Sequence, residues 1–163
     1  MDVLEAIRTK RAVRRFTDQS VPEALISEIL HAGRRAQSSR NHQPWRFLVV
    51  RERATLEQLA RCGAGAGHLA GAAFAVVLVS AVPWAFDIGQ AAAQMQLAAW
   101  HYGIGSCLAS LGDAERARAI LGVPGDQTIE IAISFGYPAD PPAPPKAGGR
   151  LSLDELVRWE RWS

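Results

Sequence analysis

The chain changes from polar to apolar within one stretch, AQSSRNHQPWRF at residues 36–47. Up to Pro44 the residues are small or polar and rich in neutral hydrogen-bonding groups, a composition typical of a loop. From Arg46 to Val50 an apolar run that ends in β-branched residues predicts a strand. Such a loop can hold the hydroxyl groups and ring heteroatoms of a ligand without offering a general base, although an ordinary turn before a strand has the same composition.

Upstream of this loop the sequence predicts two helices. Leu4 and Ile7, with basic residues near them, indicate a short first helix. Ser20 and Glu23 have the spacing of a capping box, and the apolar residues after them recur at helical period. We therefore expect a second helix that begins at this box and runs to about Arg35.

A cationic segment, KRAVRRF at residues 10–16, separates the two predicted helices. Its pattern is extended from Val13 onward, and it holds four cations within six residues. At β spacing the side chains of Lys10 and Arg14 share a face, so both could reach one phosphorylated ligand while Val13 packs inward. A solvated basic surface would explain the same residues.

Downstream of the loop, a short helix is expected from Thr55 to about Cys62, and a buried strand at 74–79. Glycines at 63, 65 and 67 connect the two elements. Because these glycines follow a helix and precede a strand, the reverse of the order in a dinucleotide-binding fingerprint, the sequence disfavours a Rossmann domain.

The second half of the chain predicts two further helices and a strand. Asp87 is positioned to cap a long helix that ends at Gly103, and a shorter helix spans residues 113–121. Alternation of apolar and polar residues over 128–135 indicates a strand. One face of this strand is expected to carry Ile129, Ile131, Ile133 and Phe135.

The carboxyl-terminal residues are expected to leave the domain as an arm. Residues 140–149 contain four prolines and two glycines, which is too stiff and too poor in apolar side chains for a core element. Ser152 and Glu155 then predict a capped final helix. That helix carries Leu153, Leu156, Val157 and Trp159. We expect residues 140–163 to dock on the partner subunit of a dimer, with wrapping around their own domain as the alternative.

Length and composition bound the class of protein. A chain of 163 residues allows one domain, residues 1–163, and 48% hydrophobic with 21% charged residues excludes disorder of the whole chain. A net charge of +2 without interleaved exposed aromatics indicates no nucleic-acid partner. The uncharged stretch 69–86 has the length to span a bilayer, but Gly71 and Pro83 favour a buried strand with flanking loops, so we expect no membrane partner.

Cysteine and histidine usage disfavours several kinds of site. Cys62 and Cys107 are far apart, which indicates neither a disulfide framework nor a zinc site and suits a reducing compartment. The amino terminus lacks the pattern of a signal peptide, so we expect a cytoplasmic protein. The four histidines are scattered without acidic partners at ligand spacing, so we expect no metal and no catalytic set of side chains.

Taken in order, these segments resemble those of the nitroreductase family of flavoproteins. The cationic segment KRAVRRF is similar to the family's RRSVRxF, and AQSSRNHQPWRF is similar to its APSSxNxQPWxF. Two further similarities are residues 87–99 with 103–107, which resemble the family's central dimer helix and the turn after it, and residues 136–138 with 150–155, which resemble its carboxyl-terminal part.

The resemblance implies an α+β fold with a central mixed sheet flanked by helices, and an intertwined homodimer with one FMN in each of two interface sites. It implies that Lys10 and Arg150 pair with the FMN phosphate. Arg11 and Arg14 would line the phosphate, the ribityl chain and the O2 side of the ring, and Ala12 stands where the family usually has Ser. The polar loop would contribute Gln37, Ser38, Ser39, Asn41 and Gln43, the first four from the other subunit. Backbone groups of Leu108, Ala109 and Ser110 would lie beside the isoalloxazine ring.

The same resemblance implies an oxidoreductase that passes hydride from NAD(P)H through FMN to an electron-poor acceptor, a nitroaromatic or a quinone, by a ping-pong mechanism. FMN would then carry the chemistry, which accounts for the missing acid and base. The stretch between Val79 and Asp87 is shorter than the helical excursion that commonly covers the flavin in the family, so we expect an open acceptor site. A non-catalytic flavin-binding dimer, or a flavin-dependent dehydrogenase of an organic donor, is the alternative.

Overall fold

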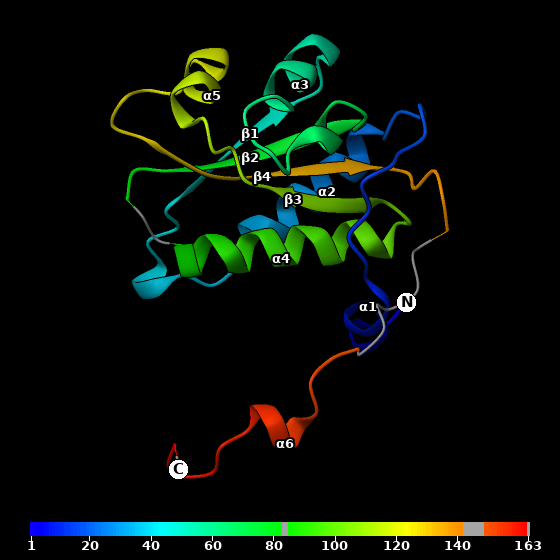
Figure 1. The fold of residues 1–163 in the computed structure, drawn as a ribbon, viewed down its shortest axis with the longest axis vertical. Coiled ribbons are helices and arrows are strands. Elements are labelled where there is room, and N and C mark those ends of the chain that lie inside the picture. The colour runs from blue at the N-terminus through cyan, green and yellow to red at the C-terminus, as the bar shows by residue number, and fades with distance from the viewer. Residues whose placement is uncertain (83–84, 142–148, 163) are drawn as a thin grey trace.

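A computed structural model describes residues 1–82, 85–141 and 149–162 of the chain. Figure 1 shows a central β-sheet with helices on both faces. The strands are β1 (Trp45–Val50), β2 (Phe74–Ser80), β3 (Gly105–Ala109) and β4 (Thr128–Gly136). The helices are α1 (Val3–Thr9), α2 (Glu23–Arg34), α3 (Arg53–Leu59), α4 (Ala85–His101), α5 (Ala114–Leu121) and α6 (Leu153–Leu156), with 3₁₀ turns η1 (Ser39–Asn41) and η2 (Gly67–Leu69).

The sheet has the strand order β1-β2-β4-β3, and each pair of neighbouring strands is antiparallel. The expected α+β architecture, a central sheet flanked by helices, is confirmed. The sheet is expected to contain both parallel and antiparallel pairs, but the parallel pairing that the structure describes is a single bridge between Ala12 and Ser106. β3 has no counterpart among the predicted strands, since its five residues, GSCLA, show neither an apolar run nor clear alternation.

Two apolar cores lie on opposite faces of the sheet. α2 and α4 cover one face, where Ile29, Met95 and Phe135 are fully buried. α3, α5 and η2 cover the other face, around Leu56 and Leu69. In Figure 1, α4 runs along one side of the sheet, while α3 and α5 lie on the opposite side. All residues of β2 are buried, as expected for a strand with helices on both faces.

A β-bulge in β4 changes which side chains face each core. Two adjacent residues of β2 pair with Ile131 and Ile129, so Glu130 is an extra residue in β4. The bulge turns Ile129 toward the core under α3 and α5, whereas Ile131, Ile133 and Phe135 pack under α2 and α4. The prediction that all four share one face is therefore wrong.

Two helix starts also differ from the prediction. α2 begins after Pro22, which makes no side-chain cap hydrogen bond, so the predicted capping box of Ser20 and Glu23 is wrong. Pro22 holds the cap position because its fixed φ, −57° here, suits the entry into a helix. Asp87 is not a cap either: it lies in the first turn of α4, and its carboxylate accepts a hydrogen bond from the Ser39 N–H at 3.1 Å.

The carboxyl-terminal helix is shorter than expected. Ser152 and Glu155 do form the predicted capping box, but the helix ends at Leu156, so Val157 and Trp159 lie beyond it. A helix this short is marginal without packing, and residues 149–162 are all exposed. These residues do not wrap around their own domain, and α6 lies well away from the sheet (Figure 1). Residues 142–148 of the predicted arm lie outside the described residues.

Candidate functional site

The cationic segment crosses one end of the sheet on the face that carries η2. The N–H of Val13 donates to the Ser106 carbonyl of β3 at 3.0 Å. Two glycines allow this close approach, because a Cβ on Gly105 would lie 2.6 Å from the Val13 Cβ, and one on Gly136 would lie 2.9 Å from the Phe16 ring. The sequence therefore places this segment against the edge of the sheet through packing that only glycine permits.

The positive charges of Lys10 and Arg14 both affect the thiol of Cys107 in β3. Burial raises the pKa of the Cys107 thiol of β3, while the positive charges of Arg14 and Lys10 lower it. Lys10 is half-buried, and this desolvation lowers the pKa of its ammonium group. The Arg11 guanidinium donates to the Arg8 and Lys10 carbonyls at 3.0 Å, at the end of α1.

The outer edge of β3 offers backbone groups beside these cations. The Ser106 carbonyl points outward to Val13, and because backbone direction alternates along a strand, the N–H and C=O of Leu108 point outward as well. The described hydrogen bonds between the cationic segment and β3 end at Ser106. The Leu108 side chain is 47% exposed, Ala109 is buried and Ser110 is exposed. This end of β3 is therefore an open edge next to two positive charges.

The polar loop before β1 is held in an unusual backbone conformation. Arg40, Asn41 and Gln43 have φ values of 49°, 58° and 47°, in the left-handed region. The Gln43 N–H donates to the Ser38 hydroxyl at 2.9 Å, and the Gln43 side chain donates to the Asn41 carbonyl at 3.3 Å. Non-glycine residues in this region cost about 1–3 kcal/mol each and are concentrated at functional sites. The loop side chains of Gln37, Ser39, Asn41 and Gln43 are exposed and Ser38 is partly buried.

One chain does not bring the cationic segment and the polar loop together. Ser39 is bound to Asp87 in the first turn of α4, whereas Thr9, next to Lys10, accepts a hydrogen bond from Trp100 in the last turn at 3.0 Å. The thirteen residues from Asp87 to Trp100 correspond to roughly 20 Å at about 1.5 Å per residue. Figure 1 shows η1 beside the start of α4 and α1 beside its end.

Arg150 is also separate from the cations in one chain. It lies in the exposed segment 149–162, which extends past α1 and away from β3 (Figure 1). The structure therefore unites Lys10, Arg14 and the open end of β3, but it leaves Arg150 and the polar loop elsewhere.

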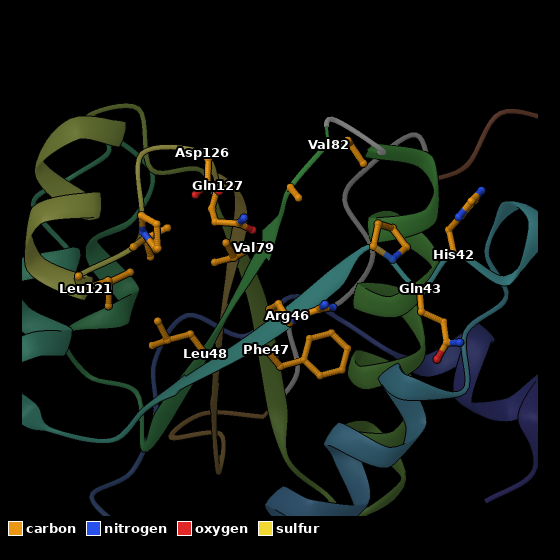
Figure 2. A pocket seen from close by; sticks show the side chains of 15 residues that line it. His42, Gln43, Arg46, Phe47, Leu48, Val79, Val82, Leu121, Asp126 and Gln127 are labelled. Atoms are coloured by element: carbon orange, nitrogen blue, oxygen red, sulfur yellow. The ribbon is translucent and has the colours of Figure 1, made fainter.

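A cavity lies at the other edge of the sheet. It measures about 880 Å³ and lies between the polar loop, β1 and the connection from α5 to β4. Figure 2 shows Arg46 and Phe47 of β1 on one side, with Leu121, Asp126 and Gln127 opposite. Its position beside β1, which pairs with β2 alone, makes it separate from the cationic edge at β3.

His68 is a site residue that the sequence did not indicate. It is 9% exposed, and its Nδ1 lies 2.8 Å from the hydroxyl of Ser134, the residue of β4 that pairs with Cys107 of β3. Ser134 is 66 residues away in the chain, so no local spacing could have found the pair. In the described parts of the chain, no group of three His, Cys, Asp or Glu side chains is arranged to hold a metal ion. No described helix is both long and apolar enough to cross a bilayer.

Comparison with known proteins identifies the family to which the chain belongs. The model of the nitroreductase family matches residues 7–81 and 66–137. A Thermus thermophilus protein named NADH dehydrogenase is 32% identical over 98% of this chain and 96% of its own. An Archaeoglobus fulgidus protein named putative NADH dehydrogenase/NAD(P)H nitroreductase is 31% identical over 99% of each chain. The chain belongs to the nitroreductase family.

Solved structures agree with this assignment. An FMN-dependent nitroreductase from Clostridium difficile is 25% identical, with a TM-score of 0.88 over 98% of this chain and 100% of that one. The NADPH:FMN oxidoreductase from Vibrio harveyi, complexed with NAD+, is 21% identical and has the same fold, with a TM-score of 0.87 over 98% of this chain and 77% of that one. The alignment with the Archaeoglobus fulgidus protein spans only 173 positions, so short chains occur elsewhere in the family.

Proposed function

We propose that this protein is an FMN-dependent oxidoreductase in which hydride from NAD(P)H passes through FMN to an electron-poor acceptor, a nitroaromatic or a quinone, in a ping-pong cycle. The observation that carries the proposal is the meeting of Lys10 and Arg14 at an open strand edge. Names of relatives that include FMN, NADH and NAD(P)H support it.

The residues at this edge fit FMN. Lys10 and Arg14 supply fixed positive charge for a phosphate and for the electron-rich side of a reduced ring. The outward N–H and C=O of Leu108 match a planar group that needs both donors and acceptors. Ala12 is exposed and supplies no hydroxyl, so the cations and the backbone carry the recognition.

In this proposal the chain binds and orients FMN, which when bound supplies the two-electron chemistry. Lys10 and Arg150 hold the phosphate, with Arg11 nearby, and Arg14 faces the ring. Leu108, Ala109 and Ser110 orient the ring through their backbone groups. The polar loop of the other subunit completes the site with hydrogen bonds from Gln37, Ser38, Ser39 and Asn41, and Gln43 also contributes to the site.

A homodimer would unite the separated parts of the site. Two copies related by a two-fold axis, with their α4 helices antiparallel, would bring the polar loop of one beside the cations of the other. The exposed side of α4 suits this packing, because Phe86 is 82% exposed and Gly89 and Ala93 are small enough for close helix contact. Apolar side chains of α1, Leu4 and Ile7, are exposed nearby.

The direct test is an anaerobic absorption spectrum of the protein after reconstitution with FMN and desalting, before and after NADH or NADPH is added. We expect flavin bands that survive desalting and bleach with the nicotinamide, followed by recovery when a nitroaromatic or quinone is added. Retained bands that neither nucleotide bleaches would favour the non-catalytic dimer or an organic donor. Loss of the flavin on desalting would contradict the proposal.

A further inference from the structure

A chain of hydrogen bonds connects His68 to β4 and β3. His68 Nδ1 lies 2.8 Å from the Ser134 hydroxyl, and the same hydroxyl lies within donating distance, 3.3 Å, of the Cys107 carbonyl. His68 Nδ1 and Ser134 share a hydrogen bond in either tautomer of the neutral ring.

The other ring nitrogen, Nε2, has different surroundings. In residues 1–82, 85–141 and 149–162, His68 Nε2 is the one buried side-chain nitrogen or oxygen that makes no hydrogen bond. Buried polar groups are nearly always paired, so an unpaired one calls for an explanation. The location of His68 supplies the explanation, because the Leu108 backbone and the charge of Arg14 both shift the pKa of its imidazole. The orphaned nitrogen thus lies at the cationic end of β3, among the groups proposed to hold the cofactor.

Burial and the positive charge of Arg14 favour the neutral form of the His68 imidazole. Burial is the largest effect and lowers the pKa of His68, Arg14 lowers it further, and the Leu108 backbone partly opposes them. Cys107 also borders this site, and burial raises the pKa of its thiol, so it is neutral as well. α3 packs beside η2, and its charged residues Arg53 and Glu57 are exposed, with Arg53 bound to the Ala70 carbonyl.

We propose that His68 is a positioning residue of the cofactor site whose imidazole takes up a proton from solvent when reduction of the cofactor adds negative charge at the edge of β3. The inference depends on the proposed function. The electrons and the first proton reach FMN together as hydride from NAD(P)H. The second proton comes from solvent and forms an N–H bond on His68, with no covalent bond to the cofactor.

The physical reason is charge balance. Arg14 disfavours a second positive charge at His68 while the edge holds no anion. A negative charge placed between Arg14 and protonated His68 stabilises the positive charge of both side chains. Because His68 is buried in surroundings of low dielectric, the effect is stronger. His68 would then hold β3 from behind through Ser134 and stabilise the reduced state through its new charge.

The first experiment is an NMR pH titration of the imidazoles in the FMN-loaded protein, oxidised and then reduced anaerobically with dithionite. We expect the pKa of His68 to rise by about one unit, a tenfold gain in proton affinity, on reduction. His31 and His101, both exposed, serve as references and should move less. An unchanged His68 titration in protein that retains FMN would overturn the inference and leave the proposed function intact.

Two variants separate proton uptake from a structural role. His68→Asn keeps an N–H for Ser134 but has no titrating nitrogen, and His101→Asn makes the same change at an exposed helix position. Indicator dye in weakly buffered solution counts protons taken up on dithionite reduction. We expect fewer protons for His68→Asn than for the wild type and no loss for His101→Asn, and equal counts in all three would refute the inference. Because dithionite replaces NAD(P)H, failure of the nucleotide to bleach FMN contradicts the proposed function alone, whereas failure to bind FMN contradicts both.

Discussion

At the scale of single residues, Lys10 is a cation held in partly buried surroundings. It closes α1 as its C-cap, with its N–H bound to the Ala6 carbonyl at 2.9 Å, and its side chain is half-buried beside Cys107. A charge held in partly desolvated surroundings binds a phosphate more strongly than a mobile surface lysine does. Arg15, by contrast, is exposed and pairs with Asp140 at 3.2 Å.

Lys10→Met should therefore weaken FMN binding by roughly tenfold to a hundredfold, the value of a charge-assisted hydrogen bond of about 1.5–3 kcal/mol. Arg15→Met is the matched control and should change the affinity by less than about threefold, because its ion pair is exposed. Quenching of flavin fluorescence on binding measures both dissociation constants. Equal affinities for the two variants would remove Lys10 from the site.

Residue-scale features differ in how far the sequence predicts them. The shared face of Lys10 and Arg14 is a prediction from β spacing alone, and both charges lower the pKa of the Cys107 thiol. The pairing of His68 with Ser134, 66 residues apart, depends on a chain path that no local pattern records. Local spacing therefore predicts side chains within one segment, and tertiary packing decides the rest.

At the scale of elements, the position of the cationic segment depends on two glycines. Gly105 allows Val13 to lie against β3, because a Cβ there would come within 2.6 Å of the Val13 Cβ. Gly112, just after β3, has open space around its Cβ position and an ordinary φ, so it offers a control in the same region.

Gly105→Ala should push the cationic segment off β3, at a cost of about 1–3 kcal/mol for the overpacked contact. We expect a lower denaturation midpoint together with loss of FMN on desalting, because Lys10 and Arg14 move with the segment. Gly112→Ala should keep the wild-type midpoint to within about 0.5 kcal/mol and retain FMN. If Gly105→Ala keeps full FMN occupancy, the close packing of Val13 is not what positions the cations.

Most strands and helices could be predicted from periodicity, and the errors have specific physical causes. The run at 74–79 is buried on both faces, and the long helix after Asp87 exists with nearly the expected length. The extra residue Glu130 shifts the alternation of side chains along β4 by one position, so Ile129 faces the opposite side of the sheet. Pro22 displaces the predicted cap, and Asp87 bonds the polar loop instead of its own helix. Partners elsewhere in the chain cause the errors at Ile129 and Asp87, whereas at Pro22 one local helix-start signal replaces another.

At the scale of the whole molecule, two features of one chain are incomplete. The parts of the proposed site lie at opposite ends of α4, and residues 149–162 of the carboxyl-terminal segment are all exposed. Leu153 is 74% exposed, Trp159 is 82% exposed and Trp162 is 88% exposed. Large apolar side chains that protrude together on a separate segment are typical of a docking element. The cavity beside the free edge of β1, lined by Phe47 and Leu48, offers an apolar surface of suitable size on a second copy.

Truncation after residue 139 should therefore dissociate the dimer, and with it release FMN, because both the docking segment and Arg150 are lost. Sedimentation equilibrium at several protein concentrations measures the change. Trp159→Ser with Trp162→Ser is the finer variant: it keeps Arg150 and should weaken dimerisation by roughly thirtyfold or more, the effect of removing interface tryptophans worth about 2 kcal/mol or more. Arg161→Ser, in the same exposed segment, is the control and should leave the dimer unchanged. A dimer of undiminished stability in the truncated chain would show that α4 and α1 form the interface alone and that residues 140–163 serve another purpose.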